Sequence, residues 1–447
     1  MLSTLSRLAP TVAALLLLMI PAMPAHAQIY VDKGAGGAND GSSWTDAFTD
    51  LQTAIDDATG NDEIWVAQGV YTPDPDGTDD TQSFTITGDQ NGLEIYGGFE
   101  GGESSRSERA PADHRVVLSG DVDGNDNTNS EGATPTAADI NGANSNHVVF
   151  LDGDRSTNPN ITSATVLDGI TISGGQDESL GGGLYCDGSD GGVCSPTLRD
   201  MIFAGNYAGG FGGALYNNGR ASGTSSPTIV GVVFTGNETN NNGGALYNNG
   251  NEDGESRPDI TNVVFADNSA AGEGGAIFNN ARASGTSSPT ITNAVFVGNS
   301  ADDGGGAIYN SGRDDGKSNP TITNATFADN TTSGSGGALH NNGTLSGTAT
   351  PQLTNTILWG NSAATSGNEI HNNSASSTIS HSIVQGGNAG IANGTGFGDG
   401  TNNLDQDPLL IAPDDPAGRD GSFGTRDDGG NVVAATSPAL DAGSNSA

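Results

Sequence analysis

Apolar, polar and glycine positions return in the same order every 31 residues between about Thr165 and Trp359. A proline opens each copy, at Pro196, Pro227, Pro258, Pro289, Pro320 and Pro351. An apolar column follows at Phe203, Phe234, Phe265, Phe296, Phe327 and Leu358, and an asparagine column at Asn206, Asn237, Asn268, Asn299, Asn330 and Asn361. A strict period of this length predicts stacked units that bury their apolar faces on one another.

Alternation within one copy predicts short strands joined by tight bends. The second residue after each proline is aliphatic, and the fourth is asparagine in four copies, where it suits a left-handed bend. A later strand follows Gly-Gly-Ala and carries Leu215, Leu246, Ile277, Ile308, Leu339 and Ile370. A column of asparagines at one bend predicts an amide ladder between copies. Because neither helices nor hairpin signals separate the strands, we predict an all-β fold, a right-handed parallel β-helix with 31-residue coils.

The flanks of the repeat are less regular. Ser43 and Asp46 resemble a capping box and predict an N-terminal capping helix over about 46–58. Strand-like segments follow at 63–67, 83–87, 93–96, 116–119 and 147–151. We therefore expect an N-terminal cap with irregular first coils (28–160), regular coils (161–388) and an irregular C-terminal segment (389–447).

The first 27 residues have the pattern of a secretory signal peptide. Arg7 precedes an apolar run from Val12 to Ile20, and Ala25-His26-Ala27 fits a cleavage site before Gln28. No later stretch is apolar enough for a transmembrane helix. We therefore predict a secreted protein, extracellular or at the cell surface.

Composition narrows the range of partners. The chain has 70 Gly, 14 Lys+Arg and 53 Asp+Glu, with a formal net charge of −39. Such a surface repels nucleic acid and anionic membranes, so neither is an expected partner. Such a surface attracts cations. The alternative is that the acidic side chains only keep the protein soluble. Cys186 and Cys194 predict a local disulfide in an oxidising compartment, the alternative being two buried thiols.

The repeat resembles a known family. F-x-x-N (Phe234–Asn237, for example) followed by G-G-A-I/L (Gly243–Leu246) resembles the repeats of polymorphic outer-membrane proteins. The flanking pieces are similar to those of choice-of-anchor Q β-helix proteins; they include Asp40-Gly-Ser-Ser-Trp44, Ile64-Trp-Val-Ala67 and Ser437-Pro-Ala-Leu-Asp-Ala-Gly443. The resemblance implies a surface adhesin with a right-handed parallel β-helix, associated with the outer membrane.

One column is a candidate binding surface. It lies between inward-facing neighbours, so alternation turns it outward, and it consists of Tyr185, Tyr216, Tyr247, Phe278, Tyr309, His340 and His371. An outward aromatic stripe could stack on the sugar rings of an extracellular polysaccharide or cell-surface glycan. The alternative is a ladder of stacked rings that stiffens the sheet or lies beneath the loops.

The acidic loop Asp121-Val-Asp123-Gly-Asn125-Asp126-Asn127 is a candidate metal site. Asp121, Asp123, Asn125 and Asn127 place oxygen ligands at alternate positions, as a calcium loop does. The alternative is a set of turn residues that bond their own backbone. No other cofactor is indicated.

The same solenoid also occurs in pectate-lyase-like enzymes, which need carboxylates beside a basic residue in a groove. The predicted strands hold few acids, and Arg199 is the one strand arginine near an aspartate. Thr228, Thr290 and Thr321 share a column, but Asp259 and Gln352 interrupt it, which argues against ice binding. We therefore favour a non-catalytic adhesion or scaffold protein with glycan binding. The alternative is a polysaccharide lyase or hydrolase.

Overall fold

The computed structural model describes residues 27–77, 79–155, 159–394, 397, 402–411 and 432–433. The predicted signal peptide (1–27), apart from Ala27, and most of the predicted C-terminal segment (389–447) lie outside the described residues. Among the described residues, no helix has the length and apolarity needed to cross a bilayer.

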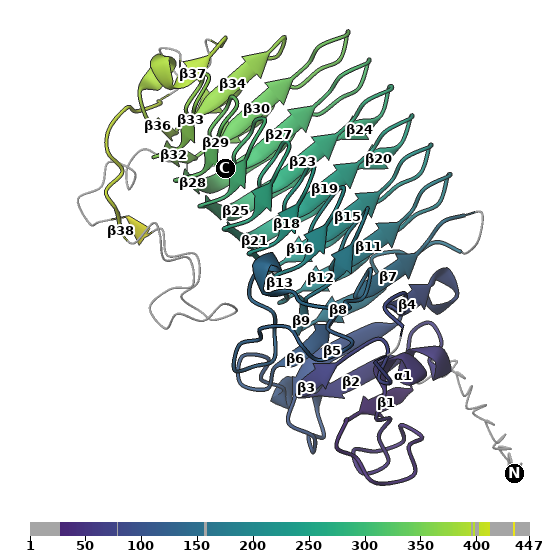
Figure 1. Ribbon diagram of the computed structural model, residues 1–447. Coiled ribbons are helices and arrows are strands. Elements are labelled where there is room, and N and C mark those ends of the chain that lie inside the picture. The colour runs from purple at the N-terminus through teal and green to yellow at the C-terminus, as the bar shows by residue number, and fades with distance from the viewer. Residues whose placement is uncertain are drawn as a thin grey trace, which may run out of the picture.

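The chain winds into a parallel β-solenoid of about 11 turns (Figure 1). Its largest sheet has 18 strands arranged in two arms. The first arm contains β1 (Gln28–Val31), β2 (Glu63–Ala67), β5 (Glu94–Phe99), β8 (Val166–Asp168), β12 (Thr197–Arg199), β16 (Thr228–Val230), β31 (Gln352–Thr354) and β35 (Thr378–Ser380). The second arm contains β3 (Gly69–Tyr71), β6 (Val116–Ser119), β9 (Ile170–Ser173), β13 (Ile202–Ala204), β17 (Val233–Thr235), β32 (Ile357–Trp359) and β36 (Ile383–Val384). Three longer strands span both arms: β21 (Asp259–Ala266), β25 (Thr290–Val297) and β28 (Thr321–Ala328).

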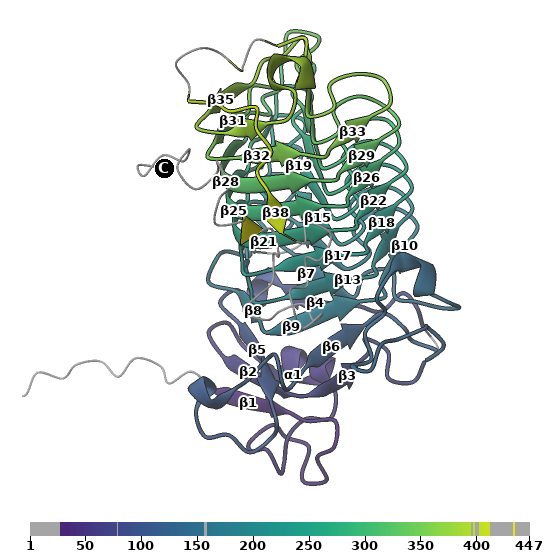
Figure 2. The ribbon, with the colours of Figure 1, turned by 90° about the vertical axis from the view of Figure 1, so that its left-hand side faces the viewer.

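Two further sheets complete the regular turns (Figure 2). The seven-stranded sheet contains β10 (Gln176–Asp177), β14 (Tyr207–Ala208), β18 (Glu238–Thr239), β22 (Ser269–Ala270), β26 (Ser300–Ala301), β29 (Thr331–Thr332) and β33 (Ser362–Ala363). The ten-stranded sheet contains β4 (Phe84–Thr87), β7 (Val149–Asp152), β11 (Leu184–Asp187), β15 (Leu215–Asn218), β19 (Leu246–Asn249), β23 (Ile277–Asn280), β27 (Ile308–Ser311), β30 (Leu339–Asn342), β34 (Ile370–Asn373) and β37 (Ile391–Ala392). Neighbouring strands in these sheets pair in parallel and in register, which confirms the predicted fold class.

The remaining elements are short. The loop strands β20 (Glu255–Ser256) and β24 (Thr286–Ser287) pair in parallel, and β38 (Leu410–Ile411) and β39 (Val432–Val433) pair antiparallel. The short helices are α1 (Leu51–Asp57), η1 (Gly88–Gln90), η2 (Arg106–Glu108), η3 (Ala137–Asp139) and η4 (Gly387–Gly390).

Apolar columns fill the interior. The predicted Phe column is fully buried, and its rings stack with centroids 4.6–4.9 Å apart. The predicted Leu/Ile columns of the first arm and of the ten-stranded sheet are buried beside it. Each coil therefore repeats one apolar layer, and the core is continuous along the solenoid axis.

Two asparagine ladders run through this interior. In the first, each Nδ2 from Asn206 to Asn330 donates to Oδ1 of the asparagine one turn later, at 2.8–3.0 Å. The same Nδ2 donates to a main-chain carbonyl of the preceding turn, and Oδ1 accepts the backbone N–H of the preceding asparagine. The second ladder joins Asn217 to Asn372 with bonds of 2.8 Å. Both ladders satisfy amides that would otherwise be buried without partners.

A third ladder lies outside, at the bend between the two arms. Asn262, Asn293, Asn324 and Asn355 have φ of 54–56°, the left-handed conformation predicted for this position. Their side chains also bond from turn to turn, at 3.0–3.1 Å, but near solvent. The residue type that tolerates the bend therefore also links the coils across it.

The predicted capping helix is present but begins later than expected. Ser43 and Asp46 do bond each other, at 3.0 and 3.2 Å, within a turn. The chain then stays extended, because Phe48 pairs with the main chain of Tyr30 and Asp32. Helix α1 starts only after Asp50, whose side chain accepts from the N–H of Thr53. Its apolar face covers the first turn of the solenoid.

Glu369 ends the first interior asparagine ladder on its C-terminal side. It replaces the alanine that stands before the Leu or Ile of the ten-stranded sheet in the five preceding turns, and it is 1% exposed. Asn361 is the last asparagine of that ladder, and its Nδ2 donates to Glu369 Oε2 at 2.6 Å. The carboxyl group thus stands where the next amide oxygen would be. Burial raises the pKa of Glu369 to about 8, against the opposing effect of the Asn361 bonds.

We predict that Asn268→Ala lowers the free energy of unfolding by on the order of 3–5 kcal/mol, because it leaves several buried groups without partners. The matched control is Asn293→Gly, which removes an exposed ladder amide and keeps a residue suited to positive φ. It should cost less than about 1 kcal/mol. Urea unfolding measures both; equal costs would contradict the assigned role of the interior ladder.

We predict that Glu369→Gln changes the pH dependence of stability. The folded pKa of Glu369 lies above its ordinary value of 4.5, so its contribution to stability is complete below that value and is lost as pH rises through about 8. The loss is on the order of 3–5 kcal/mol. Because glutamine stays neutral, the free energy of unfolding of the variant should rise relative to that of the wild type as pH rises from about 5 to about 9. Parallel pH profiles of thermal unfolding would refute this assignment.

Candidate functional site

The aromatic column lies on the outer side of the ten-stranded sheet, but it is not exposed. Tyr216, Tyr247, Phe278 and Tyr309 are only 3–5% exposed, and His340 is 9% exposed. Tyr185 and His371, near the two ends of the column, are half-buried. Neighbouring rings from Tyr216 to Tyr309 stack almost parallel at 5.1–5.2 Å. The expected exposed aromatic surface was therefore wrong, and the rings form the alternative, a covered ladder.

Two kinds of contact explain this burial. The glycine turn that precedes each strand lies over the column, so a Cβ on Gly212 would come within 3.1 Å of the Tyr247 Cβ. The Phe211 ring also packs 4.7 Å from the Tyr247 ring. Tyrosine hydroxyls accept bonds of 2.8 Å from asparagine side chains one turn later, such as Asn280 Nδ2 to Tyr247. Burial raises the pKa of Tyr216 to about 12. Burial, with a smaller effect from the neighbouring His371, lowers the pKa of His340 to about 4.

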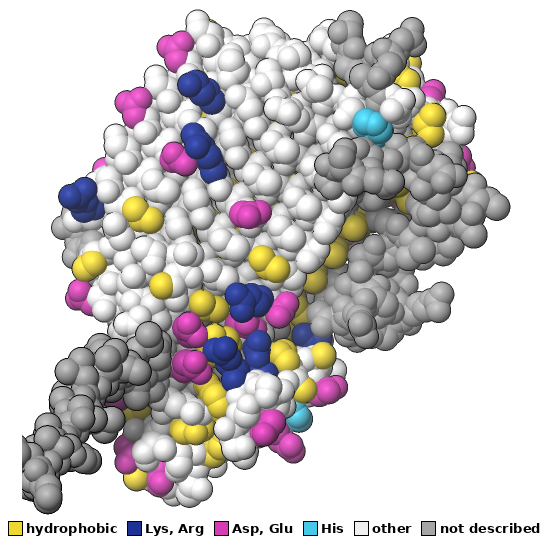
Figure 3. All heavy atoms as spheres, turned by 180° about the vertical axis from the view of Figure 1, so that it is seen from behind, with side chains coloured by type: hydrophobic (Ala, Val, Ile, Leu, Met, Phe, Trp, Pro, Cys, Tyr) yellow, Lys and Arg dark blue, Asp and Glu magenta, His cyan; other side chains and the backbone are white. Residues whose placement is uncertain are grey.

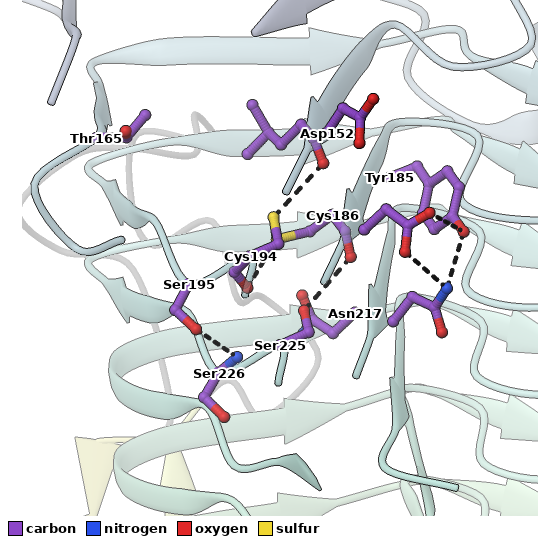
Figure 4. Close-up of a disulfide and its surroundings, with 12 residues drawn as sticks. Asp152, Thr165, Tyr185, Cys186, Cys194, Ser195, Asn217, Ser225 and Ser226 are labelled. Carbon is purple, nitrogen blue, oxygen red and sulfur yellow. Dashed lines mark hydrogen bonds between the residues drawn. A yellow bond between two sulfur atoms is a disulfide. The ribbon is translucent and has the colours of Figure 1, made fainter. Parts of the chain in front are cut away.

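The predicted disulfide is present at the start of the regular coils (Figure 4). Cys186 stands in register with Asn217, the first residue of the second interior ladder, and both cysteines are fully buried. Ser225 Oγ donates to the Cys186 carbonyl at 3.4 Å. The disulfide therefore occupies the interior position that asparagine takes in later turns.

The predicted calcium loop is organised by hydrogen bonds within the chain. Asp121 accepts the backbone N–H groups of Gly124, Asn125 and Asp126 at 2.8–3.1 Å. Asp123 accepts from Asn125 Nδ2 and from a backbone N–H, and the backbone N–H of Asn127 donates to Asp139. In the described residues, no group of three or more His, Cys, Asp or Glu gathers where it could hold a metal ion. These bonds are those of a turn stabilised by its own aspartates, and calcium binding by this loop stays a prediction.

The exposed outer face of the first arm carries a different pattern. One register column consists of Thr228, Asp259, Thr290, Thr321, Gln352 and Thr378, and the next of Val230, Thr261, Thr292, Thr323, Thr354 and Ser380. From Asp259 onward the first column is exposed, and the second is half-buried. The external asparagine ladder runs beside them. Seen from behind, the later coils present a mostly uncharged polar surface (Figure 3).

The same face becomes charged toward the N-terminus. The second column continues backward through Arg199 and Asp168 to Tyr96 and Trp65. Asp168 is 1% exposed and pairs with Arg109 at 2.7 Å and with Arg199 at 3.5 Å. Figure 3 shows basic and acidic side chains gathered on this part of the face.

A second set of contacts extends this charged cluster. The Arg106 guanidinium lies 4.4 Å from the centre of the Tyr96 ring and pairs with Glu63 and Glu94 at 3.2–3.3 Å. Burial, then the neighbouring Glu94, raises the pKa of Tyr96, so its hydroxyl stays protonated and is not poised as a base. The cluster is an ion-pair network in which each arginine is matched by a carboxylate. Sequence reasoning found only Arg199, because Arg106 and Arg109 come from a loop outside the repeat.

Comparisons with known proteins agree with the repeat pattern. Residues 231–249, 262–280 and 293–311 match the Chlamydia polymorphic membrane protein repeat, which confirms the predicted resemblance over three coils. The crystal structure of pectate lyase Pel9A is similar over 93% of this chain and 91% of that chain, with 13% identity and a TM-score of 0.37. A search of curated proteins finds no match. The resemblance to choice-of-anchor Q proteins stays a prediction.

We predict that the aromatic column contributes mainly to stability. Tyr247→Phe, the residue found at Phe278, should cost about 1 kcal/mol through loss of one hydrogen bond. Tyr247→Ala should cost about 3–5 kcal/mol, because it opens a cavity in a stacked column. Urea unfolding distinguishes the two. A cost below about 1 kcal/mol for the alanine variant would show that the ring is exposed in solution.

Proposed function

We propose that this protein is a secreted or cell-surface, non-catalytic adhesion scaffold whose exposed first-arm face binds an extended polysaccharide. The observation that carries the proposal is the pair of hydroxyl- and amide-bearing columns on that face. Strands in register repeat about every 4.8 Å, so the face offers hydrogen-bonding groups at a regular spacing over several turns. An extended polymer with repeating hydroxyl groups is the chemical class that matches such a surface.

Location supports the same proposal. The N-terminal signal pattern predicts export, and the matched repeat is named for a membrane protein of Chlamydia. A local disulfide fits an oxidising compartment. The interior ladders link each turn to the next, which gives a rod that can hold a binding face straight.

The ion-pair cluster supports the proposal that the protein is not a catalyst of polysaccharide cleavage. Catalysis of polysaccharide cleavage needs an acid or base free to exchange a proton with the substrate. Asp168 instead is buried between two arginines, and Arg106 is held by two glutamates. The second candidate, a polysaccharide lyase or hydrolase, rests on the presence of carboxylates beside arginines on an exposed face.

We predict that replacing the hydroxyls of Thr290, Thr292, Thr321 and Thr323 by Val weakens polysaccharide binding at least about tenfold, which is about 1.4 kcal/mol. Valine keeps the β-branched shape and occurs naturally in the second of the two columns, at Val230. The control, Thr331→Val, changes an exposed strand threonine on the seven-stranded sheet of the same coil. Sedimentation with insoluble cellulose, chitin and cross-linked pectin measures binding. Binding that survives in the four-residue variant would exclude this face.

An activity assay separates the two candidate functions. The wild type is incubated with pectate, alginate and neutral polysaccharides, with and without Ca²⁺, and new reducing ends or unsaturated products are measured. The proposal expects no product above the blank. Turnover that is lost in Arg199→Ala would establish the enzyme instead.

A further inference from the structure

We propose that a polar hollow at the N-terminal end of the seven-stranded sheet is a binding site for a neutral sugar residue. The hollow has a volume of about 520 Å³ and forms between β10, β14 and the loop that precedes β7. It lies on a different sheet from the first-arm face, so this site is separate from the proposed polymer-binding surface. Figure 2 shows β10 beside the irregular N-terminal loops.

Tyr207 makes this place unlike the rest of its column. The outward position of the seven-stranded sheet holds Gln176, Tyr207, Glu238, Ser269, Ser300, Thr331 and Ser362 in register. Only Tyr207 is aromatic in this column, and it lies where the regular coils meet the loop that precedes β7. The ring is half-buried, and its hydroxyl accepts a bond from Asn240 Nδ2. A tyrosine ring beside polar groups is suited to the apolar face of a sugar.

Asn144 supplies an independent observation, an unpaired acceptor beside the hollow. It belongs to the lining and is 4% exposed. Its Nδ2 donates to Asp126 at 2.9 Å and to the Gly174 carbonyl at 2.6 Å, which fixes the orientation of the amide. Its Oδ1 has no hydrogen-bond partner. Buried amide oxygens are normally paired, and a sugar hydroxyl that displaced the lining around this oxygen would be a suitable donor.

The charge of the lining selects the class of sugar. Asp80, Asp177 and Glu178 line the hollow, and no Lys or Arg does. The described carboxylates do not come together as a metal site. Carboxylate and amide groups accept hydrogen bonds from hydroxyls, whereas the negative potential disfavours a uronic acid. The geometry therefore points to a neutral sugar rather than an anionic one.

The test uses methyl glycosides of glucose, galactose, mannose and N-acetylglucosamine, with galacturonic acid as the anionic probe. Binding to the whole protein is followed by saturation-transfer NMR and by calorimetry. We expect at least one neutral glycoside to bind and galacturonic acid not to bind. Tyr207→Ser introduces the residue type found at Ser269 and Ser300, so the strand should be preserved. The variant should weaken glycoside binding at least tenfold. Glu238→Ser, in the same column but outside the lining, should leave binding unchanged.

Each other result overturns the site. Absence of binding by every neutral glycoside, equal affinity in Tyr207→Ser, or preference for galacturonic acid would each do so. If calorimetry with Ca²⁺ gave a binding signal that persisted in Tyr207→Ser, while no glycoside bound, the ligand of the hollow would be a cation and not a sugar. The four-valine variant of the first arm separates this proposal from the preceding one, because it should keep glycoside binding while losing polymer binding.

Discussion

The hydrogen bonding of buried asparagine amides is the constraint on which the structure depends. Each interior Asn side chain finds its partner only one turn later, at the same position of the next coil. A coil that gained or lost a residue would shift this register and leave several polar groups buried without partners. The exact period of 31 residues follows from this requirement more than from the apolar columns, since apolar contacts tolerate small shifts.

The ladders also have direction, and the two ends differ. Every bond of the interior ladders runs from Nδ2 of one turn to Oδ1 of the next, so the donor ends point toward the C-terminal coils. At the first ladder's C-terminal end, Glu369 supplies the final acceptor. At the second ladder's N-terminal end, Asn217 Oδ1 lacks a donor, because Cys186 and its disulfide occupy the preceding turn. Irregular residues thus stand where a repeating network must end.

Any ligand must bind to the outer surfaces, because the interior side chains are packed in stacked columns. The first-arm face changes along one column from aromatic, through an arginine–carboxylate network, to threonine. The polar hollow beside Tyr207 lies at the junction of regular and irregular coils. A site with its own chemistry requires such a break, since an unbroken repeat offers the same groups at every turn.

The sequence by itself determined the coil. Its period fixed the stacking of parallel strands, the inward Phe and Leu/Ile columns, the asparagine ladder and the left-handed bends, because these depend on positions that recur within one chain. The tertiary structure alone decided exposure. Alternation placed Tyr247 on the outer side of its sheet, yet the turn at Gly212 and the ring of Phe211 cover it. The tertiary structure likewise brought Arg109 to Asp168 and placed Tyr207 and Asn144 around one hollow, although these residues come from different coils or loops. Strand periodicity specifies which face a residue takes, but what lies over that face depends on loops that obey no period.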